Sequence, residues 1–592
     1  MAAHEDGEHP SALTARRSRL SAFLSSPGMP PAAIALIAFA VFAPACRNGF
    51  VWDDEINLVG NVHYRGLGWS HLRWMLTTGT MGHWIPLTWL SFGLDYLMWG
   101  MNPAGYHLTN ILLHATAAAA FYFVALRLLR AAMPLTGEAT LRLGAATAAL
   151  FFALHPLRTE SVAWTTERRD VLSGLLFFVT VLTYLRACES EGAGRRGWLA
   201  GSVASYALAL ASKSIVMTLP LVLIVLDIYP LRRTGGGWRG RIAEKLAYFA
   251  LAIAGASIAS SMARVPALIQ EKPLSVRLAI SAYSHWFYLW KTVFPLGLSP
   301  LYELPARVSL LDPPFLSSAL AVVAITTGLW LLRRRWPAGL AIWAIYALML
   351  APVSGLVHAG PQLVANRYSY LSCLGWALLI GAGVCVAVRA GTGGALRSSY
   401  ARLPVIAATL WIAGLAGLSL DQIRVWRDTD TLWRSALDAD PRCDFCHANL
   451  GAALEKRGLY GAAIEHFETA LALRPDSTLP RRNLALTLLR AGRPAEADAE
   501  LRRLVAAAPV DADLRNYLGV ALIREGRLEE AVEQLQRAVR VNPGHAEALT
   551  NLGTTLATLD RPAEALPILR KAIAITPGDA RLRDALRRLD RP

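Results

Sequence analysis

Three consecutive acidic residues follow the first long apolar run of the sequence, and they are the first candidates for chemistry. Asp53, Asp54 and Glu55 come shortly after the apolar run 30–46. Adjacent carboxylates raise one another's pKa, so one of them can act as a general base near neutral pH. Acids in a hydrated loop would give the same pattern. We interpret Asp53 and Asp54 as the candidate catalytic pair.

A second group of ionisable residues lies in the segment 155–170, between two apolar runs. The segment is typical of an interfacial helix that carries cations at the level of the lipid headgroups. Arginine suits bidentate contact with phosphate, so the segment could bind a lipid phosphate. Anchoring of the chain at the interface is the alternative. The candidate binding residues of this group are His155, Arg158, Glu160, Arg169 and Asp170.

Two further cations stand at the ends of apolar runs. Lys213 lies between two runs, and Arg367 ends a polar loop at 365–368. Snorkelling of the long side chain to the interface would explain either residue alone. Together with Arg158 and Arg169 they would form a cationic rim of the kind that a lipid-phosphate substrate needs.

Polar side chains also mark one face of the apolar run 106–129. His107, Asn110 and His114 are three and then four residues apart, so they share a helical face. The spacing resembles a metal site, but no HExxH pattern is present. We therefore favour hydrogen bonding to a polar substrate or to a loop, and a mechanism without a metal.

One cysteine motif needs a separate interpretation. Cys443, Cys446 and His447 match the CxxCH pattern of haem attachment. A predicted repeat helix runs through the motif and leaves little room for a macrocycle, which disfavours haem. A local disulfide and two separate thiols stay open. The other four cysteines suggest no disulfide framework.

The elements that must position these residues are helices that cross a membrane. Runs of roughly 17–22 apolar residues recur up to residue 420, and each is long enough to span a bilayer as a helix. The stretch 278–297 holds His285, Lys291 and Pro295 among aromatic residues, and we interpret it as re-entrant or interfacial. The eleven predicted spans are 30–46, 106–129, 143–154, 170–187, 197–211, 214–230, 246–262, 314–332, 337–351, 368–388 and 403–420.

Charge sets the expected orientation. The 592 residues carry a net charge of +16, of which +15 belongs to residues 1–420, since 26 basic and 25 acidic residues follow. The excess therefore belongs to the membrane half, where basic loops mark the cytoplasmic side, and does not indicate nucleic acid. We expect a multi-pass protein of a bacterial inner membrane. The disordered tail 1–29 would be cytoplasmic, and the loop 47–105 and everything after 420 periplasmic.

The segment 421–592 has a period of 34 residues. Proline recurs at this spacing from Pro441 to Pro577, and leucine, small residues and alanine recur in the same register. This is the signature of tetratricopeptide (TPR) repeats, which stack into a solenoid with a concave surface for extended peptide. A plain spacer or a dimerisation scaffold is the alternative. The predicted repeats are 442–475, 476–509, 510–543 and 544–577, with a half-repeat at 428–441 and a capping helix at 578–591.

Both halves together resemble the transmembrane-and-TPR protein O-mannosyltransferase family of the GT-C glycosyltransferase superfamily, in its prokaryotic branch. The similarity covers almost the whole chain from residue 30. It implies an all-α fold in which a GT-C-like membrane domain, 30–420, precedes the TPR solenoid. The matching segments are 50–54, 85–90, 107–110, 113–114, 155–156, 160–164, 167–170, 212–213, 218–220, 227 and 366–371.

The resemblance also implies a reaction. Mannose would move from a polyprenyl-phosphate carrier to a Ser or Thr hydroxyl of a protein, with inversion. Asp53 would take the acceptor's proton, and Asp54 would orient acceptor or sugar. Arg158, Arg169, Lys213 and Arg367 would stabilise the departing phosphate, and the TPR groove would present the polypeptide. One departure concerns Arg367, because Asn366 stands where the family pattern has an acid.

Two other functions stay open. The chain could be a non-catalytic membrane scaffold whose repeats recruit envelope proteins, or a GT-C transferase that acts on a lipid or glycan. A scaffold has no need of an acid pair and cations beside the bilayer. A peptide-binding surface has no use with a lipid acceptor.

Overall fold

The computed structural model describes residues 26, 28–233, 237–262, 272–305, 307–356, 362–390 and 395–589. The chain forms two compact units, Met1–Ser435 and Ala436–Pro592. The regular elements of the described residues are helices apart from two short antiparallel strands, β1 (Tyr302–Glu303) and β2 (Gln362–Val364), which confirms the all-α prediction. Nearly all of the predicted tail 1–29 lies outside the described residues.

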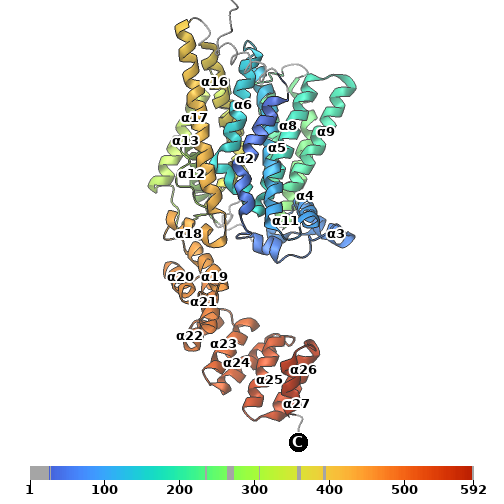
Figure 1. Ribbon diagram of the computed structural model, residues 1–592, viewed down its shortest axis with the longest axis vertical. Coiled ribbons are helices and arrows are strands. Elements are labelled where there is room, and N and C mark those ends of the chain that lie inside the picture. Colours follow the sequence, from blue (N-terminus) through green and yellow to red (C-terminus); the bar gives the residue numbers. More distant parts are fainter. Residues whose placement is uncertain are drawn as a thin grey trace, which may run out of the picture. The chain divides into compact units, whose positions relative to one another are not determined.

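Every predicted span falls on a helical segment of the first unit (Figure 1). Long apolar runs become helices because only a helix satisfies all backbone polar groups within one segment. Several of the helices have proline in their first turn, where no hydrogen bond is lost. The elements are α2 (Met29–Phe42) with η1 (Ala43–Arg47), α5 (Pro103–Ala132), α6 (Glu138–Leu154), α8 (Arg168–Glu189), α9 (Gly192–Ser212), η6 (Ser214–Thr218) with α10 (Leu219–Ile228), α11 (Gly237–Met262), α13 (Pro313–Leu331), α14 (Pro337–Leu350) with η7 (Ala351–Val353), α15 (Ser369–Ser372) with α16 (Leu374–Ala390), and α17 (Ala395–Val425).

Fewer helices than eleven are long and apolar enough to cross a membrane. Among the described residues six qualify alone, and eight if each of two bent helix pairs counts as one span. The segments Ser214–Ile228 and Pro337–Val353 are apolar but short, and α9 is not among the candidates. The stretch predicted to be re-entrant or interfacial forms one helix of 20 residues, α12 (Leu274–Val293), which is not among the candidates either.

The predicted loop 47–105 is folded rather than extended. It contains η2 (Glu55–Val59), α3 (Trp69–Thr77), η3 (Thr80–Gly82) and α4 (Pro86–Trp99), and Figure 1 shows α3 and α4 at one end of the helix bundle. A hydrophobic core of its own holds the loop together. The core residues are Leu58, Tyr64, Met75, Ile85, Trp89, Phe92 and Tyr106.

The segment 155–170 differs from the predicted interfacial helix. It consists of three short turns, η4 (Pro156–Arg158), α7 (Thr159–Ala163) and η5 (Thr165–Glu167), followed by the first turn of α8. Pro156 disfavours helical geometry at His155, so α6 ends there and the chain bends by 54°. The residues of the segment are buried. The prediction of a single helix is therefore wrong, because the segment consists of short turns, and its charges lie inside the protein.

The second unit consists of antiparallel helix pairs, as the 34-residue period predicts. A Cβ atom at Gly451 would lie 2.8 Å from the Phe467 ring, and one at Gly519 would lie 2.6 Å from Leu535, so the paired helices approach too closely for a larger residue. The pairs are α19 (Asp444–Lys456) with α20 (Tyr460–Leu473), α21 (Thr478–Arg490) with α22 (Pro494–Ala507), α23 (Ala512–Arg524) with α24 (Leu528–Val541), and α25 (Ala546–Thr558) with α26 (Pro562–Ile575).

Single helices flank these pairs. α18 (Thr429–Ala439) coincides with the predicted half-repeat, and α27 (Ala580–Leu589) with the predicted cap. The boundary between the two units falls within α18, so the predicted boundary at 420 lies too early, inside α17. The last residues of the predicted cap, 590–591, lie outside the described residues.

Candidate functional site

The acid pair lies in a tight turn between η1 and η2. The amide of Asp54 donates to the Val51 carbonyl (3.0 Å), and the Val51 amide donates back to Asp54 Oδ2 (3.0 Å). Trp52, between them, has a φ of 53°, in the left-handed region that non-glycine residues rarely adopt. The turn therefore fixes where the two carboxylates can point.

The two carboxylates have different surroundings. Asp54 is fully buried, and its Oδ1 accepts hydrogen bonds from the amide (2.7 Å) and the hydroxyl (2.6 Å) of Thr166. Asp54 thus fastens the turn to η5, and its oxygens are occupied by the protein. Asp53 is only partly buried and is the acid of the pair that stays accessible.

Burial is the main reason that the pKa of both carboxyl groups is raised. It raises the pKa of Asp54 to about 7, although the hydrogen bonds from Thr166 oppose the shift. Burial also raises the pKa of Asp53, while Arg169 and Arg367 favour its charged form. The expected repulsion between neighbouring carboxylates makes only a minor contribution at Asp54. A carboxylate with a raised pKa is a stronger base than an ordinary aspartate.

Three predicted phosphate-binding cations meet at one buried carboxylate, Glu167. Arg169 Nη2 lies 2.5 Å from Glu167 Oε1, Lys213 Nζ lies 2.9 Å from Oε2, and Arg367 Nε lies 3.3 Å from Oε1. Lys213 also contacts Asp170 (2.7 Å). The segments that deliver these residues are the first turn of α8, the end of α9 and the turn η8 (Asn366–Tyr368).

Arg367 pairs with a second acid, Glu160, although Asn366 stands where the family pattern has an acid. Its guanidinium pairs with Glu160, and its backbone amide donates to the same carboxylate (3.2 Å). Asn366 instead donates to the Ser299 carbonyl (2.9 Å) and accepts from the Tyr302 hydroxyl (3.1 Å). The cations therefore form a buried network with carboxylates in place of the cationic rim that we expected.

Arg158 differs from the other three cations. It is 2% exposed, and its guanidinium carbon lies 5.5 Å and 5.8 Å from the ring centres of Phe152 and Tyr370. Its Nε and Nη1 atoms have no hydrogen-bond partner among the described residues. A buried guanidinium without a full set of acceptors retains the capacity to bind an anion.

The histidines and the asparagine support the loops. His107 Nε2 lies 3.3 Å from the Gly49 carbonyl, just before the acidic turn. Asn110 donates to the carbonyls of Val162 and Trp164 (3.3 Å each). These contacts match the predicted hydrogen bonding to a loop.

Two further histidines make similar contacts with the backbone. His155 Nε2 lies 3.0 Å from the Thr292 carbonyl, and His114 Nε2 lies 3.0 Å from the Ala153 carbonyl. Across the described part of the chain, no three His, Cys, Asp or Glu residues are grouped so that they could hold a metal ion.

Sequence reasoning missed two parts of this arrangement. In the sequence, nothing distinguishes Glu167, the shared carboxylate, from its charged neighbours at 167–170. Arg168 and Asp95 form a fully buried ion pair (2.6 Å), in which Arg168 also donates to the Tyr106 carbonyl (2.8 Å). A lone aspartate in the apolar helix α4 was the available signal, because such a charge needs a partner.

The CxxCH motif forms a disulfide. Cys443 and Cys446 are joined at the first turn of α19, with a Cα–Cα distance of 5.2 Å. His447 Nε2 lies 3.2 Å from the Pro441 carbonyl, and its Nδ1 lies 2.9 Å from Nδ1 of His466. Of the interpretations left open, the structure has the local disulfide.

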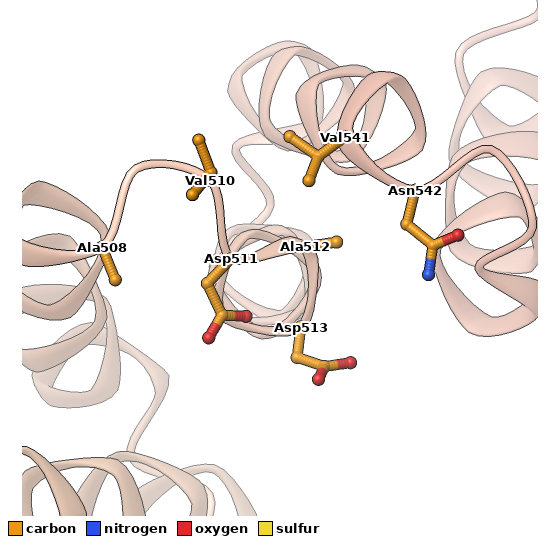
Figure 2. Close-up of a pocket in the computed structure, with 7 residues that line it drawn as sticks. All are labelled: Ala508, Val510, Asp511, Ala512, Asp513, Val541 and Asn542. Atoms are coloured by element: carbon orange, nitrogen blue, oxygen red, sulfur yellow. The ribbon is translucent and has the colours of Figure 1, made fainter. Parts of the chain in front are cut away.

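An open pocket of about 570 Å³ lies in the second unit (Figure 2). It lies where the turn before α23 meets the end of α24, and it holds none of the predicted site residues. Its lining residues are Ala508, Val510, Asp511, Ala512, Asp513, Val541 and Asn542. A much smaller cavity, of about 10 Å³, lies beside Arg169 and is also lined by His83.

The tetratricopeptide repeat family matches residues 445–477, 482–540 and 524–580. Two solved structures resemble part of the chain, each with a TM-score of 0.25. YrrB, titled a TPR protein with an unusual peptide-binding site, is 28% identical and covers 31% of this chain and 90% of its own. MamA from Desulfovibrio magneticus is 23% identical and covers 29% of this chain and 94% of its own.

Two relatives of known name cover most of the chain. Protein O-mannosyl-transferase TMTC4 of Mus musculus is 27% identical over 509 residues, 73% of this chain and 65% of the mouse protein. Tmtc3 of Drosophila melanogaster, with the same descriptive name, is 24% identical over 479 residues, 70% of this chain and 51% of the fly protein.

Identity is higher over a shorter region. Protein O-mannosyl-transferase Tmtc1 of Drosophila melanogaster is 34% identical over 180 residues, 29% of this chain and 20% of the fly protein. The matched regions thus span between 20% and 65% of these three relatives' own length. The resemblance to the transmembrane-and-TPR protein O-mannosyltransferases, predicted from the motifs, is confirmed.

Proposed function

We propose that this chain is a membrane glycosyltransferase that moves a sugar, mannose by analogy with its relatives, from a polyprenyl-phosphate carrier to Ser or Thr hydroxyls of proteins. The observation that carries the proposal is the partly buried Asp53 within electrostatic reach of Arg169 and Arg367. A general base beside held cations is what a sugar transfer with a phosphate leaving group needs.

The reaction would proceed in one displacement. Asp53 takes the proton of the acceptor hydroxyl, and the hydroxyl oxygen forms a bond to the anomeric carbon. The bond from that carbon to the phosphate oxygen breaks, and its electron pair leaves with the polyprenyl phosphate. Attack opposite to the leaving group inverts the anomeric configuration. Asp54 would position the turn that carries the base, and no step requires a metal.

The cations would stabilise the charge that develops on the phosphate. Arg169, Lys213 and Arg367 share the carboxylate of Glu167, which keeps them together before a substrate arrives. Cations that are held in place need no reorganisation when the phosphate becomes more negative. Arg158, with free hydrogen-bonding capacity, is the further candidate for a phosphate oxygen. The paired cations would bind phosphate by sharing their donors between it and the carboxylates.

The TPR repeats would bind the polypeptide acceptor, on the predicted periplasmic side of a bacterial inner membrane. The cytoplasmic N-terminus and the identity of the sugar belong to the same proposal. A TPR concave surface suits an extended chain, which favours a protein acceptor over a lipid or glycan. A scaffold without activity would use the same repeats but would not need Asp53.

The test uses the purified full-length protein with polyprenyl-phosphate mannose and a Ser/Thr-rich peptide, with and without EDTA. We expect transfer of mannose in both conditions and a rate about 10²- to 10⁴-fold lower for Asp53→Asn, as for loss of a general base. Asp421→Asn, at an exposed acid that pairs with Arg424, is the control that keeps its activity. If the wild type consumes no polyprenyl-linked sugar, the scaffold is the better proposal.

A further inference from the structure

Trp52, the residue that precedes Asp53, forms a cluster with three other tryptophans. The Trp52 ring stacks on Trp164 with a centroid distance of 4.7 Å and an interplanar angle of 3°. Trp426 stacks on Trp164 at 5.3 Å, and Trp433 meets Trp52 edge to face at 5.0 Å. Trp164, Trp426 and Trp433 are almost completely buried. We refer to these four residues as the tryptophan cluster.

The backbone on both sides of the cluster is joined as well. The Gly49 amide donates to the Arg427 carbonyl (2.9 Å), and the Asn48 side chain donates to the Ile423 carbonyl (3.2 Å). The chain before the acidic turn is therefore attached to the end of α17 and to the link between α17 and α18. α18 is the helix in which the first unit ends and the TPR unit begins.

Trp52 holds a backbone conformation that a free chain avoids. Its φ of 53° brings its Cβ into conflict with the backbone, and such conformations persist only where the surroundings determine them. Here the surroundings are the stacked ring of Trp164 and the edge contact with Trp433. Since Asp53 follows directly, the φ and ψ of Trp52 decide the direction in which the Asp53 carboxylate points.

The cluster also contacts the cation network. The guanidinium carbon of Arg367 lies 5.5 Å from the centre of the Trp164 ring. Arg367 in turn lies within electrostatic reach of Asp53 and pairs with Glu160 and Glu167. One tryptophan, Trp164, therefore supports both the turn that carries the proposed base and a cation proposed to bind phosphate.

We propose that Trp52, clamped between Trp164 and Trp433, is a positioning residue that aims the Asp53 carboxylate, and that the segment leading into the TPR repeats is part of this support. The inference rests on the proposed function. It assigns Trp433 a role in catalysis through Trp52, although Trp433 belongs to the helix that begins the repeats.

Two substitutions of Trp52 distinguish the effect of losing its ring contacts from the effect of relieving its backbone strain. Trp52→Gly accepts the left-handed backbone without strain but removes the ring, whereas Trp52→Phe keeps an aromatic ring for stacking. Trp433→Ala and Trp433→Phe repeat the comparison from the other side of the contact. Trp343→Ala is the matched control, since Trp343 is 5% exposed and lies in the separate core around Tyr288.

The measurement is transfer of mannose by the full-length protein, with kcat and KM for donor and peptide determined separately. We expect Trp52→Gly and Trp433→Ala to lose about 10- to 100-fold in kcat with both KM values unchanged, as expected for misplacement of a reacting group. The two Phe variants should recover most of the rate. Trp343→Ala should lose thermal stability but keep its kcat.

Three results would overturn the inference while leaving the proposed function intact. They are an unchanged kcat in both ring-removing variants, a rise in KM alone for Trp52→Gly, which would make Trp52 a substrate contact, and an equal loss in the Trp343→Ala control. If the wild type shows no transfer, the proposed function fails. Amide hydrogen exchange of the turn 51–57 then tests the support of Trp52 by itself. If Trp433→Ala does not accelerate this exchange, Trp433 does not hold Trp52 in place.

Discussion

At the scale of single residues, two neighbouring acids of the same type have different environments. The sequence predicts that Asp53 and Asp54 matter, but it treats them as a pair. The structure separates them. The amide and the hydroxyl of Thr166 both donate to one oxygen of Asp54, whereas Asp53 is partly exposed. No sequence pattern could predict this, since Thr166 is more than a hundred residues away and was part of no motif.

Substitution of Asp54 should affect stability more directly than chemistry. In Asp54→Asn one oxygen becomes an amide nitrogen, which cannot accept from the Val51 or Thr166 donors. A buried donor left unpaired costs about 1–3 kcal/mol. We expect a lower unfolding temperature for Asp54→Asn in detergent, and an unchanged one for Asp53→Asn. Equal unfolding temperatures for the two variants would contradict the structural role of Asp54.

The pH dependence of transfer should report the state of Asp53. The base must be ionised, and burial raises its pKa, so the rate should rise with pH along a limb that lies above the ordinary aspartate pKa of about 3.9. Arg169 lowers the pKa of Asp53, so Arg169→Gln should move this limb to higher pH. The exposed Arg130→Gln should leave it in place. A limb that moves to lower pH would exclude Asp53 as the titrating group.

At the scale of elements, apolar runs predicted the positions of the helices well and their contacts poorly. A run of apolar residues reports its own tendency to form a buried helix, whereas pairing depends on residues far apart in the chain. Lys245, for example, is in the sequence one of the basic residues that indicate a cytoplasmic loop. In the structure it is fully buried against Asp227 and Tyr184, at the end of α8 opposite to Asp170.

Glycine contacts between helices provide a test at this scale. Gly381 in α16 faces Gly144 in α6, and a Cβ at Gly381 would lie 2.3 Å from the Gly144 carbonyl oxygen. Because a backbone atom cannot move aside as a side chain can, Gly381→Ala should destabilise the protein by about 1–3 kcal/mol, as overpacking does. At Gly383 in the same helix, a Cβ would meet no described atom within 4 Å.

Thermal unfolding of the two alanine variants measures this difference. Both substitutions raise helix propensity equally, so only the contact distinguishes them. Gly383→Ala should match or slightly exceed the wild type in unfolding temperature. A Gly381→Ala variant as stable as Gly383→Ala would show that α6 and α16 do not approach as closely as described.

At the scale of the whole molecule, the basic excess and the repeat period divide the chain in nearly the same place. The membrane half carries a net charge of +15 and the rest +1. Basic loops mark the cytoplasmic side, so the predicted orientation puts the repeats on the other side of the membrane. The boundary between the two units could not be located from composition. α18 belongs to the repeats by period, but Trp433 within it lies in the first unit, where it packs on Trp52.

The disulfide of the first repeat tests this orientation. Disulfides persist in oxidising compartments such as the periplasm and are reduced in the cytoplasm. If the repeats are periplasmic, Cys443 and Cys446 should be found linked when cells are alkylated without a reducing agent, and the remaining four cysteines alkylated. Mass spectrometry of the peptides gives the answer. Two alkylated thiols at 443 and 446 in the native protein would place the repeats in the cytoplasm.

The stability of the first repeat depends on the same bond. A loop closed over four residues limits the unfolded chain only slightly, so the disulfide should contribute about 2 kcal/mol in the chain-entropy estimate. The double variant Cys443→Ala/Cys446→Ala should therefore lower the unfolding temperature of the repeats but leave them folded, since the other three repeats keep their packing. If the double variant instead abolished repeat folding, the first repeat would be the nucleus on which the array depends.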